Sequence, residues 1–458
     1  MKIIKFLIGI IATVTSFTAA AEVIEFGGIT FEFDGEKCVV TNPPSGIYSG
    51  DVVIPSCVTI DDKEIPVTGI GDYAFANSTQ LKTVAIPKSV TDVGRNAFQG
   101  CSLITEINFP EGVSEIKDQT FYECLSLVSF KGEGVVSVGK SAFYYCSSLS
   151  SVIFSEGLAF VGDSGFNYCI SIENFEFPSE AELGNNVFYG CSSLQKVILP
   201  FNLDRIPSST FYGCVALREV EGTENIMEIG DNAFYTCRSL STFESGKALN
   251  KIGKNAFCFC SDLDISVING NGEAIIEEHA FDGCKSLQKI DFKGIRTIGS
   301  DAFSNNSELQ SLFFDEALHD IGDRAFTRCD NIAFITSKRE IPPFMKNTAF
   351  DDATYKKAVL VVPDGSGELY RQTPPWSYFD HTGETGIKAV KDEGGIDVLV
   401  SGRHIEICDE AQGIVSLFSI SGSKISETIK ADNKIYITAP CNGSYIITLN
   451  GRSKKIII

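Results

Sequence analysis

The chain has 458 residues, 43% of them hydrophobic, and a formal net charge of −21 at pH 7. This length and hydrophobic content are ample for a long buried core. A chain this acidic is a poor default partner for nucleic acid or for an anionic membrane surface, because like charges repel.

The first 21 residues have the three parts of a secretory signal peptide. Lys2 and Lys5 give a positive start, residues 6–12 form an apolar core, and residues 19–21 supply an Ala-Ala-Ala cleavage site. Removing this segment takes two positive charges from −21 and leaves −23. A membrane anchor is the alternative, but the apolar run is too short to span a bilayer. We therefore predict export, with no transmembrane segment after signal removal.

Residues 22–66 are expected to form an N-terminal β cap. Two alternating segments, 29–33 and 38–41, flank Asp34-Gly35 and predict a hairpin with a tight turn. Residues 51–55 already resemble the strand of the repeats that follow. Such a cap would cover the first apolar face and blunt an exposed sheet edge.

From residue 67 to residue 352 the chain repeats itself about every 23 residues. The marker is a phenylalanine, usually preceded by alanine, at Phe75, Phe98, Phe121, Phe143, Phe166, Phe188, Phe211, Phe234, Phe257, Phe281, Phe303, Phe326 and Phe350. Three residues later, ten repeats carry a cysteine: Cys101, Cys124, Cys146, Cys169, Cys191, Cys214, Cys237, Cys260, Cys284 and Cys329. Alternating segments that end at proline, as in 104–110 and 194–200, predict strands with one buried face.

This pattern resembles the BspA-like family of leucine-rich repeats. The resemblance covers residues 67–352 and implies a repeat solenoid of about 13 repeats of 22–24 residues, with a parallel β-sheet on its concave face. A lone repeat half-covers its apolar side chains, which contributes on the order of 6 kcal/mol. Ordering its backbone costs about 1–2 kcal/mol per residue. Stability therefore requires stacked neighbours and capped ends.

The fifteen cysteines of an exported chain first suggest disulfides. The ten repeat cysteines, however, would stand in one column with parallel side chains, whereas a disulfide needs converging Cβ vectors. We expect buried free thiols that act as small hydrophobes. No metal site is expected, because no two CxxC pairs occur. Outside the column, the pairs that could form bridges are Cys38 with Cys57 and Cys408 with Cys441.

No segment of the sequence indicates a catalytic site once the repeat pattern is taken into account. The string Gly162-Asp163-Ser164-Gly165 is similar to a serine-protease nucleophile loop, but it falls where another repeat reads Gly-Asp-Asn-Ala-Phe. The four histidines lie in different segments without a partnered nucleophile. We predict that the protein is not an enzyme and uses no cofactor; a hydrolase is the third function class weighed.

Two outward surfaces are candidate binding sites. One is the strand face, whose outward positions include Glu176, Lys196, Glu219, Glu221 and Glu244. Its carboxylates would suit a basic or calcium-bridged partner, or only keep the face solvated. The other is a ridge of tyrosines one residue after the phenylalanine, interrupted by Asn167: Tyr122, Tyr144, Tyr189, Tyr212 and Tyr235. Tyrosine is enriched in binding surfaces, and simple packing of the convex turns is the alternative.

The C-terminal part changes character in two steps. Residues 353–385 are expected to be a cap and linker, in which Trp376 covers the last open face and 381–386 is the linker. Residues 386–458 alternate short strands with turns and predict a small antiparallel β-sandwich.

The strand order of this last region resembles the C-terminal sorting domain of the type IX secretion system. The segments that carry the resemblance are 417–422, 442–445 and a basic pair before a final apolar strand. It implies a Gram-negative exporter, periplasmic transit and delivery to the cell surface, with residues 386–458 contacting the export machinery. A plain structural β-domain is the alternative.

We interpret the chain as an exported, non-enzymatic binding protein, secreted or held at the cell surface. The BspA-like resemblance implies adhesion to host, matrix or other bacterial surface proteins. The alternative is a glycan-binding or nutrient-scavenging surface protein, since aromatic ridges beside carboxylates could serve a sugar. The outward carboxylates lead us to expect a protein ligand on the concave face between repeats five and eight. The competing surface is the ridge at Tyr189, Tyr212 and Tyr235.

Overall fold

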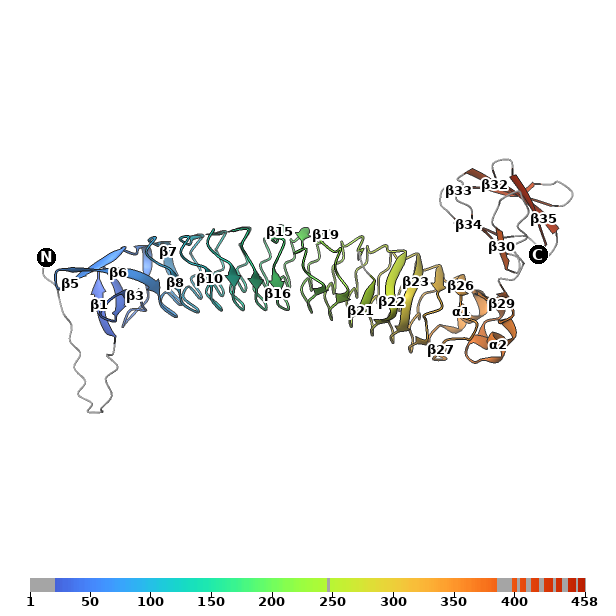
Figure 1. Ribbon diagram of the computed structural model, residues 1–458, viewed down its shortest axis with the longest axis horizontal. Helices are drawn as coiled ribbons and strands as arrows, with labels where there is room; N and C mark the ends of the chain where they lie inside the picture. Colours follow the sequence, from blue (N-terminus) through green and yellow to red (C-terminus); the bar gives the residue numbers. More distant parts are fainter. Residues whose placement is uncertain are drawn as a thin grey trace. The chain divides into compact units, whose positions relative to one another are not determined.

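The computed structural model describes residues 21–244 and 248–384, and seven strands between residues 398 and 457 (Figure 1). The expected signal peptide lies outside the described residues, apart from residue 21. The chain divides into two compact units, one of residues up to 264 with 276–286, and one of residues 265–275 with 287–458.

The first unit begins with six strands, and three of them lie at segments predicted for the N-terminal cap. They are β1 (Glu22–Phe26), β2 (Ile29–Phe33), β3 (Cys38–Val40), β4 (Ser49–Val53), β5 (Cys57–Ile60) and β6 (Lys63–Ile70). The predicted hairpin forms, because β2 and β3 pair antiparallel with Phe31 opposite Val40. Strand β4 pairs in parallel with β7 (Gln80–Ala85), which confirms the strand predicted at 51–55. Cys38 and Cys57 are free, so they form no bridge with each other.

The repeats form a parallel β-solenoid of about 14 turns. Within the first unit, the first strand row consists of β4, β7, β9 (Glu106–Asn108), β11 (Ser129–Gly132), β13 (Ser151–Phe154), β15 (Asn174–Glu176), β17 (Lys196–Ile198) and β19 (Glu219–Glu221). The second strand row consists of β8 (Asp92–Val93), β10 (Glu115–Ile116), β12 (Ser137–Val138), β14 (Phe160–Val161), β16 (Glu182–Leu183), β18 (Arg205–Ile206), β20 (Glu228–Ile229) and β21 (Leu249–Ile252). Figure 1 shows β15 and β19 at the upper edge, above β10 and β16. Only one strand row had been predicted.

The one-sided strands expected from the alternation are confirmed. In β9, Ile107 is buried between the exposed side chains of Glu106 and Asn108. Ile107 is in register with Phe130 of β11, which is in register with Val152 of β13. Inward side chains of neighbouring turns therefore meet in columns, and polar side chains face solvent.

The phenylalanine-bearing loops form the third side of each turn, here called the turn row. Consecutive marker rings from Phe75 to Phe281 stack with centroids 5.0–6.0 Å apart. The backbone adds hydrogen bonds between turns; for example, Phe75 N–H donates to the Ala97 carbonyl at 2.8 Å. The marker positions are therefore a continuous apolar stack, as the repeat period predicted.

The column cysteines are buried free thiols, as predicted, but they are also hydrogen-bond donors. Each of the ten thiols donates to the carbonyl of the marker phenylalanine one repeat earlier, at 3.0–3.1 Å, as Cys169 does to Phe143. Burial raises the pKa of the Cys101 thiol to about 12 and that of Cys124 well above its usual value. Most of these carbonyls also accept a backbone hydrogen bond from the residue three positions later, as Phe98 does from Cys101 N–H at 3.1 Å. The thiol therefore adds a second hydrogen bond between turns, which a small hydrophobe would not make.

The loop that is similar to a protease nucleophile site is a repeat variant, as predicted. Asp163 Oδ1 accepts a hydrogen bond from Asn185 N–H at 2.7 Å, and Asp72 Oδ1 accepts one from Arg95 N–H at the same distance. Ser164 has φ 59°, in the left-handed region that the corresponding residue of other turns also adopts. The Gly-Asp step therefore links successive turns.

The second unit contains further repeat strands and a closing end of its own. Its strands are β22 (Val267–Ile276), β23 (Lys289–Ile298), β24 (Ser311–Phe314), β25 (Asp320–Ile321), β26 (Phe334–Ser337), β27 (Phe344–Met345), β28 (Val359–Val362) and β29 (His381–Glu384), with helices α1 (Asp352–Lys357), α2 (Gly367–Gln372) and η1 (Trp376–Tyr378). Trp376 is fully buried and its Nε1–H donates to the Pro343 carbonyl at 2.7 Å, in keeping with a closing role.

One expectation about this end is wrong. Residues 381–384 were predicted to be linker, but they form β29, which pairs in parallel with β28 from Val359 opposite His381. The free edge of β28 offers unpaired backbone groups, and this segment satisfies them. Residues 385–397 lie outside the described residues.

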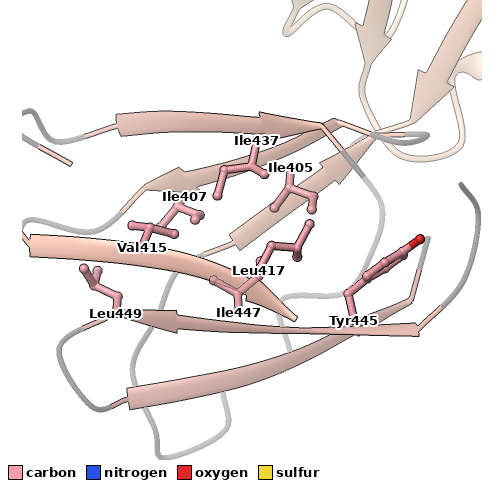
Figure 2. Close-up of a cluster of buried hydrophobic side chains, with 8 residues drawn as sticks. All are labelled: Ile405, Ile407, Val415, Leu417, Ile437, Tyr445, Ile447 and Leu449. Atoms are coloured by element: carbon pink, nitrogen blue, oxygen red, sulfur yellow. The ribbon is translucent and has the colours of Figure 1, made fainter. Parts of the chain in front are cut away.

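The C-terminal strands form the predicted antiparallel sandwich. They are β30 (Val398–Ser401), β31 (His404–Cys408), β32 (Gly413–Ser419), β33 (Lys424–Lys430), β34 (Lys434–Thr438), β35 (Ser444–Leu449) and β36 (Arg452–Ile457). One sheet has the order β30-β31-β34 and the other β33-β32-β35-β36. Figure 2 shows their shared core of Ile405, Ile407, Val415, Leu417, Ile437, Tyr445, Ile447 and Leu449. Strands β30 and β33 were not predicted, and the pairing of Cys408 with Cys441 falls outside the described residues.

Candidate binding surfaces

Most of the predicted carboxylate surface lies on three paired strands of the first unit. Strands β15, β17 and β19 align Asn174 with Lys196 and Glu219, and they align Glu176 with Ile198 and Glu221. The intervening Phe175 and Val197 point inward and are buried. The sequence pattern therefore selected the outward positions correctly.

The electrostatics of this surface differ from the expected cluster of like charges. Lys196 Nζ lies 2.6 Å from Glu221 Oε1 and 3.3 Å from Glu219 Oε2. The hydrogen bond with Glu221 raises the pKa of Lys196, and the same bond lowers the pKa of Glu221. The cation that balances these two carboxylates is thus on the same sheet, and no bound metal ion is needed for them.

Glu244 stands apart from the paired strands. Residues 241–244 form no strand, and residues 245–247 lie outside the described residues. Thr223 Oγ1 donates to the Glu244 carbonyl at 2.7 Å, which holds this segment beside the preceding turn. Glu244 is exposed, but it does not share the register of Glu219 and Glu221.

The tyrosine ridge is continuous and longer than the sequence suggested. Stacked pairs are Tyr122–Tyr144 at 4.8 Å, Tyr189–Tyr212 at 4.4 Å and Tyr212–Tyr235 at 4.7 Å, with interplanar angles of 5°, 4° and 12°. Tyr145 and Tyr168 bridge the gap that Asn167 leaves, and Phe259 extends the far end. These three aromatic residues stand two positions after the marker phenylalanine, a signal that the sequence contained and that our interpretation missed.

The ring faces within the stacked pairs cover one another. Tyr189, Tyr212 and Tyr235 are therefore half-buried, and their accessible parts are ring edges and hydroxyl groups. Burial, and then the neighbouring Tyr212, raises the pKa of Tyr189 to about 12. The geometry supports a packing role for these rings at least as well as a binding role.

The first strand row is interrupted between β13 and β15. Strand β13 pairs with β11 and β15 pairs with β17, but no pairing joins β13 to β15. A groove of about 600 Å³ opens at this break. Its lining includes Val152, Phe154, Ile172, Phe175, Glu156 and Glu176. No feature of the repeat pattern indicated this break, and only Glu176 of its lining had been selected.

No other part of the described chain suggests chemistry. Among residues 21–244, 248–384 and the C-terminal strands, no group of three or more His, Cys, Asp or Glu side chains is placed to hold a metal ion. The helices in this same part are all too short and too polar to cross a membrane. The candidate sites are therefore the charged strand face, the tyrosine ridge and the groove.

A family model places these repeats among known proteins. The model of the BspA type leucine-rich repeat region matches residues 68–193, 181–275 and 270–360. Together these ranges run from residue 68 to residue 360, which is more than half of the chain. The search of curated proteins gave no match.

The chain is similar to several solved structures. A leucine-rich repeat protein from Bacteroides ovatus is 26% identical with a TM-score of 0.59, over 79% of this chain and 98% of its own. A leucine-rich cell surface protein from Faecalibacterium prausnitzii is 21% identical, with a TM-score of 0.45, over 81% of this chain and 97% of its own. The pneumococcal vaccine antigen PcpA is 19% identical, with a TM-score of 0.48, over 78% and 96%. The Bacteroides structure supports the leucine-rich repeat architecture described above.

Proposed function

This chain belongs to the BspA-type leucine-rich repeat family, and from that premise we propose that it is an exported, non-enzymatic protein that binds another protein at the bacterial surface. Stacked repeats create extended surfaces that proteins of this architecture use for binding. A fold alone does not fix a ligand, so the binding region has to come from this chain's own outward residues.

The observation that carries the proposal is the outward face of β15, β17 and β19. It sets Glu176, Lys196, Ile198, Glu219 and Glu221 side by side in register on neighbouring strands. Charges of both signs beside a half-buried isoleucine give a surface of mixed polarity, as in protein–protein interfaces outside their cores. The excess of carboxylates favours a partner with a basic patch, since complementary charge speeds association and gives specificity.

The test is a binding assay of the purified chain against a panel of host matrix proteins and bacterial surface proteins. We expect at least one protein ligand, whose affinity falls as salt rises. The variant E219Q/E221Q/E244Q should bind it more weakly at an unchanged melting temperature. The matched control E115Q/E123Q/E182Q removes three exposed carboxylates elsewhere on the solenoid and should bind normally. Loss of binding on replacing Tyr189, Tyr212 and Tyr235 with serine, with no loss in the first variant, would instead place the site on the ridge.

A glycan ligand has less support. Sugar rings commonly stack on open aromatic faces, and the faces of Tyr189, Tyr212 and Tyr235 are covered by one another. A glycan array run beside the protein panel separates the two functions, because binding to glycans alone would favour the sugar-binding alternative.

Export is the second half of the proposal. The signal-like segment 1–21 and the resemblance of residues 386–458 to a type IX sorting domain support it. The strands of this region have a hydrophobic core of their own, which suits a separable module (Figure 2). Deleting residues 386–458 should leave the solenoid folded and trapped in the periplasm. Cell fractionation that finds the truncated chain at the surface would remove the sorting role.

A further inference from the structure

The break between β13 and β15 leaves strand edges open on both sides of the groove. Phe177 N–H donates to the Ile198 carbonyl at 3.0 Å, so this residue faces β17. Successive residues of a strand direct their backbone groups to opposite neighbours. The N–H and C=O groups of Asn174 and Glu176 therefore face β13 across the groove.

The same reasoning applies to β13. Ser151 N–H donates to the Val128 carbonyl at 3.1 Å, so Ser151 faces the β11 side. Val152 and Phe154 then direct their backbone groups toward β15. All residues of 150–155 and 172–177 are described, and no backbone hydrogen bond joins the two segments. Corresponding segments are bonded between β11 and β13 and between β15 and β17.

The floor of the groove is apolar core that the break exposes. Ile107, Phe130 and Val197 occupy the inward strand position in intact parts of the row and are at most 1% exposed. Val152 occupies the same position at the break and is only half-buried, as is Phe154 two residues later. Solvent therefore reaches apolar side chains that a neighbouring strand would cover.

The charges at the rim are also uncompensated. Glu156 and Glu176 line the groove, and neither has a salt-bridge partner among the described residues. Glu219 and Glu221, two strands away, share Lys196. A ligand that enters the groove therefore meets open backbone edges, an apolar floor and two free carboxylates.

We propose that this groove binds an extended segment of a protein, which adds a strand to the open edge of β15. Backbone hydrogen bonds to Asn174 and Glu176 would hold the segment, and its alternate side chains would reach the floor. Those side chains are apolar, and the ones between them include lysine or arginine that pair with Glu156 and Glu176. The inference rests on the proposed protein-binding function, and it names the part of a protein that is recognised.

The experiment uses fluorescein-labelled nine-residue peptides in which lysine or arginine alternates with valine, isoleucine or phenylalanine. Fluorescence anisotropy with the purified chain should detect binding of at least one such peptide, and the same peptides with glutamate in place of lysine and arginine should bind at least about tenfold more weakly. Two further versions of each peptide carry N-methyl groups, one at the odd-numbered residues and one at the even-numbered residues. At least one of the two should bind about tenfold more weakly, because two backbone hydrogen bonds to the groove are lost. The amides of Asn174 and Glu176 should exchange more slowly with deuterium in the complex.

Two matched pairs of variants locate the site. N174P removes an N–H that faces the groove and is expected to abolish binding, whereas E106P places proline at the aligned position of β9, whose edge toward β7 is also unpaired, and should bind normally. E156Q/E176Q should weaken binding about tenfold, and E219Q/E221Q should not.

The proposal is overturned if none of the basic peptides binds, or if both N-methylated versions bind as well as the unmethylated peptide. It is likewise overturned if the N174P variant binds the peptide normally. It is also overturned if the chain sediments as a dimer that N174P dissociates, because the occupant is then a second copy of the chain. If the peptides do not bind but a protein of the panel still does, and its binding depends on Glu219 and Glu221, the groove proposal fails and the proposed function stands. Absence of any protein ligand, with peptide binding intact, would instead remove only the proposed surface on β15, β17 and β19.

Discussion

The turn row and the first strand row of the first unit belong to the same turns, yet they differ in continuity. In the turn row, every consecutive pair of marker phenylalanines from Phe75 to Phe281 stacks, and thiols and backbone amides tie each turn to the next. In the first strand row, the pairing stops between β7 and β9, between β13 and β15, and after β19. Successive turns are therefore held together even where their first-row strands are not paired.

The difference shows which part of a repeat is constrained by its neighbours. The turn row links adjacent turns in three ways, through aromatic stacking, thiol hydrogen bonds and backbone hydrogen bonds. Loss of the strand ladder at one place therefore leaves the stack intact, and the strand row is free to open a groove. In a nearest-neighbour architecture, each interface contributes separately to stability, so the contrast can be tested one turn at a time.

The largest effect should follow from removing a marker ring. Phe166 is fully buried, with ring centroids 5.2 Å from Phe143 and 5.6 Å from Phe188. Phe166→Ala should cost about 3–5 kcal/mol, through lost burial and the cavity left behind. Phe154→Ala, at the half-buried edge of the groove, should cost about 1–2 kcal/mol. Urea unfolding, monitored by hydrogen exchange of the amides in this region, measures the loss of stability in both variants. Equal losses would contradict the idea that the turn row contributes most to the stability of the stacked turns.

A glycine pair separates backbone strain from crowding within the turn row. Gly190 and Gly213 have φ of 73° and 74°, so alanine at either site adopts the left-handed region, at a cost of about 1–2 kcal/mol. A Cβ on Gly190 would lie 2.7 Å from the Tyr168 ring, whereas the nearest atom to one on Gly213 is 3.7 Å away. Gly190→Ala should therefore cost about 1–3 kcal/mol more than Gly213→Ala. Equal melting temperatures would mean that the Tyr168 ring moves aside freely.

The thiol column should make stability depend on alkaline pH. Burial raises the pKa of Cys101 to about 12 from the usual 9.0, and it raises those of the other fully buried column thiols as well. As the pH rises above 9, thiols ionise in the unfolded chain first, so the stabilisation present below pH 9 is progressively lost. Replacing three column cysteines with alanine should flatten the fall of the urea midpoint between pH 8 and pH 10.5. Tyr189, with its pKa raised to about 12, acts in the same direction and is unchanged in the variant.

The state of the same thiols can be read by alkylation with mass spectrometry. In the native chain the column thiols should resist alkylation while the half-exposed Cys57 reacts, because the reactive species is the thiolate. In denaturant without reductant, all ten should be alkylated. A bridge between any two column positions would contradict both the geometry and the expected reactivity.

The interior of the turns could be predicted from the sequence because the period repeats there. Positions such as Phe166 and Cys169 recur at fixed spacing, and a recurring residue in a stack meets its own copies, so its burial follows from the spacing alone. The outward positions Glu176 and Glu219 followed from strand alternation in the same way.

The rest depends on geometry that alternation does not encode. The pairing of Lys196 with Glu219 and Glu221 depends on which side chains neighbour one another across strands. Three residues of the ridge lie two positions after the marker phenylalanine, whereas the predicted ridge lies one position after it. The break at β13 has no counterpart in the residue pattern, since Val152 and Phe175 hold equivalent positions. By contrast, a break in the second strand row does have a cause in the sequence. At the aligned position, Gly184 and Gly230 each donate an N–H to the preceding turn, but Pro207 has no N–H to donate. This accounts for the missing pairing of β16 with β18.

The smallest effect on stability should come from substitutions on the charged strand face. This prediction contrasts with the large effect expected in the turn row. Lys196, Glu219 and Glu221 are solvent-accessible, and exposed ion pairs contribute little to folding because water and salt screen them. Lys196→Gln should leave the urea midpoint unchanged within error. The same substitution should raise the pKa of Glu221 toward its usual value, because the hydrogen bond from Lys196 is the largest of the effects that lower it. Titration of ¹³C-labelled glutamate carboxyls measures this shift. A large loss of stability in Lys196→Gln would mean that the strand row, and not only the turn row, holds these repeats together.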